Sequence, residues 1–196
     1  MANLLMQGFH PDQEIKAKTQ WYPVASGYGT ALARGDVVTL LTDGTVASAT
    51  DGDADLILGV IKQVRYTSNG KRITDTYLPA LTTYSGGAFG RDMSEVEVYD
   101  DPYQEYWGCL ASHTDTDTAT EVQAAVGKNM DITTGAPNST YRCSTHVLNG
   151  NAEVAVRRFR VVAVRRVPGR SIGSANLHVK VRINEGFHPF HSTAGI

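Results

Sequence analysis

The feature that most constrains the fold is a strict alternation of apolar and polar residues near the end of the chain. In the segment HVKVRIN the order is His178, Val179, Lys180, Val181, Arg182, Ile183. Successive side chains of a β-strand point to opposite faces of the sheet, so the three apolar residues would share one buried face. A helix would distribute the same residues around its axis. The pattern therefore predicts a half-buried strand.

Two β-hairpins are predicted earlier in the chain. In the first, GDVVTLL and VASA flank TDGT, where Asp43-Gly44 can supply the positive φ of a tight turn. In the second, LILGVIKQVRYT and RITDTYLPA flank Asn69-Gly70, the strongest local turn signal in the sequence. Unbroken alternation along LILGVIKQVRYT would place Val60 and Val64 on one face and Ile61 on the other.

The other apolar segments also have the composition of strands. They are SEVEVYDDP, EYWGCLAS, MDITTG, YRCSTHVL and AEVAVRRFRVVAVRRV. In the last of these, the alternation slips near Arg157-Arg158 and near Arg165-Arg166, which indicates bulges. ATEVQAAVGKN, closed by Gly127, is the one good helix candidate. The expected fold class is therefore all-β, and the expected units are an N-terminal arm (1–20), a β body (21–184) and a C-terminal arm (185–196).

Composition excludes several classes of protein. The chain has 196 residues, a net charge of −2 and a pI near 6.3, which argues against binding nucleic acid through total charge. No stretch approaches the length of apolar sequence that spans a membrane. MANLLMQGFHPDQE lacks the basic region of a signal peptide, so we expect no classical secretion. The two cysteines, Cys109 and Cys143, form no CxxC motif and are expected to be buried free thiols rather than a disulfide or a zinc site.

The tetrapeptide GFHP occurs twice, at 8–11 and at 186–189. His10, His188 and His191 would make a three-histidine metal site if the two ends of the chain met, but no carboxylate spacing supports one. A structural repeat is a second interpretation, although so short a match arises readily by chance. The interpretation we favour is that both segments are docking arms. The predicted docking residues are Phe9, His10, Pro11, Phe187, His188 and Pro189.

No motif for catalysis or for a cofactor is present. DGDAD (51–55) resembles the start of a calcium loop, but Leu56 and Lys62 stand where that loop needs glycine and glutamate. The tripeptide RGD (34–36) directly precedes VVTLL, so a turn leading into a strand explains it. GxSxG, HExxH, P-loop and GxGxxG patterns are all missing. Serine, histidine and aspartate occur, but their presence says nothing about geometry. We therefore expect no enzyme activity and no cofactor.

Charge is unevenly distributed along the chain. Residues 157–170 carry Arg157, Arg158, Arg160, Arg165, Arg166 and Arg170, and residues 92–105 carry Asp92, Glu95, Glu97, Asp100, Asp101 and Glu105. Aromatic residues that could stack on bases are sparse in the basic stretch, so protein contacts are favoured over nucleic acid. The two stretches could pair within one chain or between neighbouring copies. The predicted inter-subunit contacts are Arg157, Arg158, Arg160, Arg165, Arg166, Asp100 and Asp101.

One long segment resembles a known family. ARGDVVTLLTDGTVASATDGDADLILGVI has the order AxGDVV, short strand, DGTV, small residues, LGVI, and is similar to the opening of capsid cement and head-decoration proteins of tailed bacteriophages. VEVYDDP, VGKNMDITTG and the VKVRIN strand also look like such proteins, so the resemblance covers residues 22–185 in blocks. It implies a compact barrel- or tulip-like β domain. Because this chain is longer than the smallest decoration proteins, a second small β lobe is expected at about 80–145.

The resemblance also implies a function. Proteins of this family sit on the outer capsid surface of the virion, often as trimers, and brace neighbouring major capsid subunits against the pressure of packaged DNA. The implied partners are the major capsid protein and further copies of this chain as a homotrimer, with no nucleic acid, membrane or cofactor. The alternative is a head- or tail-fibre-associated protein that binds a host surface glycan by stacking sugars on Tyr103, Tyr106 and Trp107.

Overall fold

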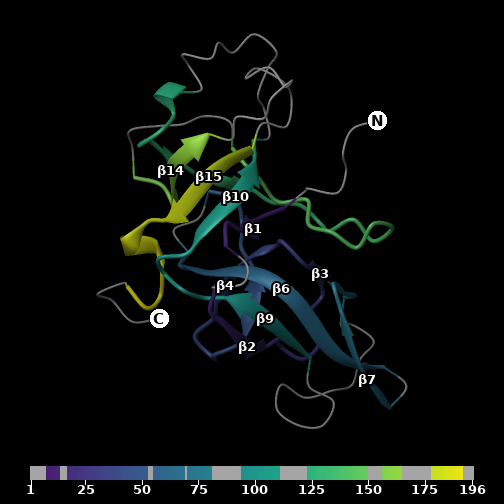
Figure 1. Ribbon diagram of the computed structural model, residues 1–196. Helices are drawn as coiled ribbons and strands as arrows, with labels where there is room; N and C mark the ends of the chain where they lie inside the picture. The colour runs from purple at the N-terminus through teal and green to yellow at the C-terminus, as the bar shows by residue number, and fades with distance from the viewer. Residues whose placement is uncertain are drawn as a thin grey trace.

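The computed structural model describes residues 8–13, 17–52, 55–68, 70–80, 94–110, 123–149, 156–164 and 178–191. They form an all-β protein, which confirms the predicted fold class (Figure 1). The elements in chain order are β1 (His10–Pro11), β2 (Thr19–Pro23), β3 (Leu32–Ala33), β4 (Val37–Leu40), β5 (Val46–Ser48), β6 (Ile57–Ser68), β7 (Lys71–Asp75), β8 (Tyr77–Leu78), β9 (Glu95–Tyr99), β10 (Glu105–Cys109), β11 (Asn129–Met130), β12 (Ile132–Thr133), β13 (Val147–Leu148), β14 (Phe159–Val164), β15 (His178–Ile183) and the 3-10 helix η3 (Glu185–Phe187). No helix in these ranges is long and apolar enough to cross a membrane.

A six-stranded antiparallel sheet is built from the first hundred residues. Its order is β2-β9-β6-β4-β5, and β7 pairs with β6 off this path. Both predicted hairpins are present in it, with Gly44 at φ 80° and Gly70 at φ 71° in the turns. An isolated parallel bridge joins Val24 to Val46 between its two edges. The described strands nevertheless form open sheets rather than the closed barrel that the resemblance implied.

A five-stranded antiparallel sheet has the order β1-β10-β15-β14-β11. Its central strand β15 is the alternating segment HVKVRIN. Val179, Val181 and Ile183 are buried in the core while the polar residues between them are half-buried on the opposite face, as the alternation predicts. Two smaller pairs, β3–β8 and β12–β13, complete the described pairing.

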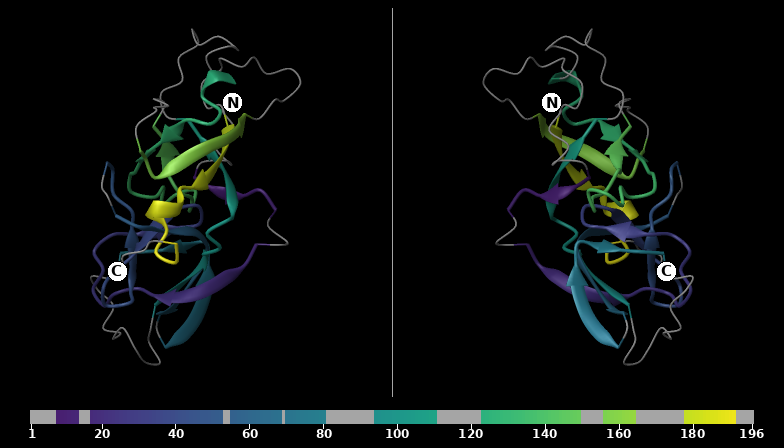
Figure 2. Two further views of the ribbon diagram at one scale, coloured as in Figure 1. Left: turned by 90° about the vertical axis from the view of Figure 1, so that its left-hand side faces the viewer. Right: turned by 90° about the vertical axis from the view of Figure 1, so that its right-hand side faces the viewer.

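The two sheets share one hydrophobic core. It contains Val37, Ile57, Val60 and Tyr99 from the six-stranded sheet, and Tyr106, Met130, Phe159, Val161, Val179, Val181 and Ile183 from the five-stranded sheet. Figure 2 shows the blue strands of the first sheet below the green and yellow strands of the second. A second apolar cluster, which includes Leu32, Leu58, Val64 and Leu78, covers the other face of the six-stranded sheet. Apolar clusters therefore cover both faces of the central part of the six-stranded sheet, whereas β7 is largely exposed.

The predicted faces of β6 need correction. Val60 lies in the core between the sheets, but Ile61 and Val64 both lie in the second cluster. The reason is a register shift against β9 between Ile61 and Gln63, which leaves Lys62 as an extra residue in the strand. One extra residue moves every later side chain to the other face. Strict alternation therefore fails in this strand.

The boundary between lobes also differs from the expected one. A lobe at about 80–145 would include β9, yet β9 lies between β2 and β6 in the six-stranded sheet. The chain passes from one sheet to the other between β9 and β10, near residue 100. Of the predicted helix ATEVQAAVGKN, the described part starts at residue 123 and consists of one turn that ends at Gly127, with φ 85°.

Candidate interaction surface

The first GFHP segment is part of the core. The backbone N–H of Phe9 donates to the carbonyl of Gly35 at 2.9 Å, and the Phe9 side chain is 3% exposed. Its ring stacks on Phe159 with centroids 5.4 Å apart. Next to it, His10 and Pro11 pair with β10. The prediction that Phe9 docks on a partner is therefore corrected, because this side chain is enclosed by its own chain.

The second GFHP segment folds differently. Phe187 ends the 3-10 helix η3 and packs, half-buried, against the shared core. His188 is fully buried, and its Nε2 lies 3.0 Å from the carbonyl oxygen of Leu58. Pro189 is buried as well. The two copies of GFHP thus form a strand in one case and a 3-10 turn in the other, so they are no structural repeat.

The histidines of the two segments do not converge. The His10 ring lies 6.4 Å from that of His178, whereas His188 is next to His191, also at 6.4 Å between ring centroids. Within the described ranges, no group of three histidine, cysteine, aspartate or glutamate residues could hold a metal ion.

The predicted basic contacts lie in different environments. Arg158 is 1% exposed, and its Nε donates to Asp131 Oδ1 at 2.5 Å. The prediction that Arg158 contacts a neighbouring subunit is therefore wrong for this fold, because the guanidinium is enclosed. Arg157 is half-buried and Arg160 is exposed. Arg165 and Arg166 lie outside the described residues.

The predicted acidic contacts are used partly inside the chain. Asp100 accepts a hydrogen bond from the Tyr22 hydroxyl at 2.7 Å, which ties the end of β9 to β2. Asp101 Oδ1 accepts from the backbone N–H of Tyr103 at 2.9 Å and so shapes the turn before β10. Neither carboxylate has an arginine of the basic stretch as a partner in any ion pair between described residues.

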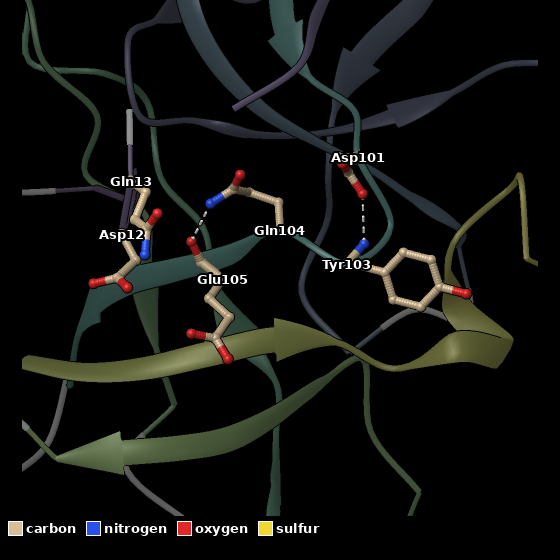
Figure 3. Close-up of a pocket in the computed structure, with 6 residues that line it drawn as sticks. All are labelled: Asp12, Gln13, Asp101, Tyr103, Gln104 and Glu105. Carbon is tan, nitrogen blue, oxygen red and sulfur yellow. Dashed lines mark hydrogen bonds between the residues drawn. The ribbon is translucent and has the colours of Figure 1, made fainter. Parts of the chain in front are cut away.

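An open pocket of about 210 Å³ lies beside this turn (Figure 3). Its lining residues are all polar: Asp12, Gln13, Asp101, Tyr103, Gln104 and Glu105. Three of them are carboxylates, and they come from two segments of the chain that β1–β10 pairing brings together. We call this set the acidic pocket.

Lys180 connects the two sides of the acidic pocket. Its Nζ lies 3.1 Å from Asp12 Oδ2 and 3.0 Å from Glu105 Oε2. Trp107 Nε1 donates to the other Asp12 oxygen at 2.6 Å. Slight burial raises the pKa of Asp12, but the hydrogen bonds from Lys180 and Trp107 outweigh it and the net pKa is lowered. The hydrogen bond to Glu105 raises the pKa of Lys180 in turn. Asp12 and Lys180 therefore stay charged over the whole neutral range.

A serine, a histidine and an aspartate meet inside the molecule. His146 and Asp36 are fully buried, and His146 Nε2 lies 3.3 Å from Ser48 Oγ and 3.7 Å from Asp36 Oδ1. His146 Nδ1 accepts the backbone N–H of Val37 at 3.1 Å. In a catalytic triad the carboxylate and the hydroxyl contact different ring nitrogens. Here both face the same one, so the cluster lacks the geometry of a proton relay and instead links β4 to the segment before β13.

The three aromatic residues of the glycan hypothesis are separated. Tyr106 is 0% exposed and donates its hydroxyl to the Tyr99 carbonyl at 2.8 Å. Trp107 is half-buried beside Asp12 and Lys180. The Tyr103 ring is 62% exposed, but it points away from Asp12 and Gln13 (Figure 3). These residues do not form one stacking platform for sugars.

Tyr103 instead belongs to an aromatic patch at the C-terminal segment. Its ring meets the His191 ring edge to face, with centroids 4.8 Å apart. The neighbouring Phe190 is 57% exposed and packs its ring near His188. We call Tyr103, Phe190 and His191 the aromatic patch. Exposed aromatic side chains grouped in this way are typical of protein interfaces. Phe190 lies one position beyond the GFHP repeat, which carries Phe187 as its aromatic residue, so the repeat does not mark it.

Comparison with protein-family models, with curated proteins and with solved structures found no match to this chain.

Proposed function

We propose that this chain is a structural protein of a tailed-phage head. It binds the outer capsid surface and cements neighbouring major capsid subunits against the pressure of packaged DNA. The observation that carries the proposal is the fold of the segment with the family resemblance. ARGDVVTLLTDGTVASATDGDADLILGVI runs from β3 to β6 and supplies three strands of one sheet, in which β4 forms a hairpin with β5 and pairs on its other side with β6.

The signature residues of that segment have backbone roles. Gly35 has φ 91°, and a Cβ there would lie 3.1 Å from the Phe9 carbonyl oxygen. Asp36 is fully buried, and its Oδ2 accepts the backbone N–H of Ala33 at 2.7 Å. This burial also leaves the RGD tripeptide without an accessible aspartate. Gly59 has its Cβ position 1.9 Å from the Tyr99 carbonyl oxygen. The fold therefore requires Gly35, Asp36 and Gly59 at these positions. A shared β fold would require the same residues, and this supports the proposal.

The aromatic patch is the proposed contact with the capsid. Phe9 and Phe187 pack inside this chain, so the proposed docking residues are Phe190 and Tyr103, which are exposed at or beside the C-terminal segment. Interfaces concentrate their binding energy in a few aromatic anchors of this kind. The many equivalent sites of a capsid lattice would add avidity to a modest single contact. Self-association, expected as a trimer, is part of the same proposal.

The test is reconstitution on purified capsids that lack this chain. Wild-type protein should bind at saturable sites, and the double variant Tyr103→Ala/Phe190→Ala should bind about tenfold more weakly or worse. Tyr141→Ala removes a similarly exposed tyrosine outside the patch and serves as the matched control. Equal binding by the double variant, with its fold intact, would remove the patch from the capsid contact. Failure of the wild-type chain to bind would contradict the proposed function itself.

A further inference from the structure

Two arginines face each other on the outer side of the five-stranded sheet. Arg160 in β14 and Arg182 in β15 are direct cross-strand partners, next to a register shift at Val161–Ala163. Direct partners have Cβ atoms about 5 Å apart on the same face. Because Phe159, Val161, Val181 and Ile183 point into the core, both arginines point outward. Like charges directly opposite each other destabilise a sheet.

Neither arginine has a carboxylate partner within the described part of the chain. Arg182 also faces Glu105 across β10, but the Glu105 carboxylate is 3.0 Å from Lys180 instead. Arg160 makes a long hydrogen bond of 3.4 Å from Nε to the Asn129 side-chain oxygen. Their positive charge is therefore left for a group outside this part of the molecule.

The acidic pocket lies on the same sheet. Glu105 is part of it and stands in the same cross-strand row as Arg182 and Arg160. Of its three carboxylates, Asp12 and Glu105 pair with Lys180, and Asp101 is in no ion pair between described residues. The sheet face thus carries excess negative charge over β1 and β10 and excess positive charge over β14 and β15.

We propose that this face is a contact between two copies of the chain, in which the Arg160–Arg182 pair of one copy meets the acidic pocket of the other. A two-fold rotation brings each charge cluster onto its complement, and every contact then occurs twice, as in an isologous interface. Val162, exposed at the bulge beside the arginines, adds apolar area. The proposal gives the self-association proposed above a surface and makes it a two-fold dimer in place of the expected trimer. It does not depend on capsid binding.

A second copy fits this face better than nucleic acid does. Glu105 is the cross-strand partner of Arg182 and would repel a phosphate backbone, whereas a protein surface can offer both signs of charge. Carboxylates of a second copy would also offset the like-charge repulsion between Arg160 and Arg182, so the contact would stabilise a pair that is unfavourable in the isolated chain.

Sedimentation equilibrium of the full chain tests this proposal. Arg160→Glu/Arg182→Glu should weaken self-association about tenfold or more, and high salt should weaken the wild type. Asp101→Lys/Gln104→Lys, which cancels the net negative charge of the pocket, should have the same effect. An equimolar mixture of the two variants should recover association, because opposite charges meet again. Lys18→Glu/Lys71→Glu makes an equal charge change at two exposed lysines outside this sheet and should leave self-association as in the wild type.

The sedimentation results distinguish the proposed face from oligomerisation in general. Self-association that survives both reversals, with circular dichroism showing intact variants, would overturn the proposed face while leaving oligomerisation in place. Loss in each variant without recovery in the mixture would also overturn it, because complementarity is the claim. A wild-type chain that stays monomeric at every concentration would remove both the face and the proposed self-association. Capsid binding measured on the same samples would still report separately on the proposed function.

Discussion

Phe9 stacks on Phe159 at 5.4 Å between ring centroids, so the second described residue of the chain packs against a core strand that lies 150 positions later. This contact makes the N-terminal segment part of the body. The Gly8 backbone, at φ 89°, is held so close to Ser144 that a Cβ would lie 2.5 Å from the Ser144 Cβ. Removal of a segment fixed in this way should lower the free energy of unfolding, whereas removal of a detachable arm would leave it unchanged.

Phe9→Ala should therefore destabilise the whole chain. Emptying a fully buried phenylalanine site costs roughly 3–5 kcal/mol. Phe190→Ala, at an exposed phenylalanine, should change the free energy of unfolding by no more than about 0.5 kcal/mol. Urea denaturation of both variants measures the difference. If Phe9→Ala were as stable as the wild type, the original arm interpretation of residues 1–20 would be restored.

Gly59 should not tolerate a side chain. A Cβ at Gly59 would lie 1.9 Å from the Tyr99 carbonyl oxygen, where β6 crosses the end of β9. Gly59→Ala must displace backbone in the centre of the sheet and should cost at least about 3 kcal/mol or prevent folding. Gly186→Ala, where nothing lies within 4 Å, is the control and should fold normally. Thermal unfolding curves measure the loss of stability. A Gly59→Ala variant with the same Tm as Gly186→Ala would contradict the close approach of Gly59 to the Tyr99 carbonyl.

The buried Asp36–His146 pair should give two opposite pH dependences. Burial raises the pKa of Asp36 from 3.8 to about 7, so across that window the folded state holds a proton that the unfolded state has released. The contribution of Asp36 to the free energy of unfolding therefore falls as pH rises. Burial lowers the pKa of His146 from 6.5 to about 4. The contribution of His146 to the free energy of unfolding therefore falls as pH falls from about 6.5 to 4.

Single variants should separate the two terms. His146→Gln leaves the aspartate term, so its stability should fall between about pH 4 and 7 more steeply than that of the wild type. Asp36→Asn leaves the histidine term, so its stability should rise over about pH 4 to 6.5. Urea midpoints at several pH values would reveal the slopes. Parallel slopes in the two variants would show that these groups do not titrate as their burial requires.

The two thiols should react in a fixed order. Cys109 is buried in β10, and burial raises its pKa to about 11. Cys143 is half-buried, and its pKa is raised first by burial and then by the charge of Asp36. A thiol reagent should therefore label Cys143 slowly and Cys109 only after unfolding. Mass spectrometry of partly labelled protein would identify the site, and prior labelling of Cys109 would contradict the position of β10.

Local patterns in the sequence predicted the strands better than the contacts between them. Val179, Val181 and Ile183 are buried as their alternation required, and both hairpin turns formed at the glycines expected. In β6 the extra residue Lys62 moved later side chains to the other face, and no composition rule marks such a shift. Whether a strand is regular depends on its partner strand.

The surface was harder to predict, because its contacts join distant parts of the chain. Asp12 and Lys180 are separated by 168 positions, so their ion pair has no local signature. Arg158 looked like a member of a basic cluster, but it is enclosed against Asp131. Arg182 was correctly placed on the polar face of β15, whereas its position opposite Arg160 follows only from the β14–β15 register. In β15 the alternation therefore predicted the face of each residue, whereas the neighbours of each residue follow only from the fold.

The most direct test of the capsid proposal is the copy number of this chain in purified virus particles, measured relative to the major capsid protein. A cement protein should be present at a fixed, simple ratio to the major capsid protein in every preparation. A handful of copies per particle would instead indicate a tail or fibre component, and complete absence from particles would contradict a virion role.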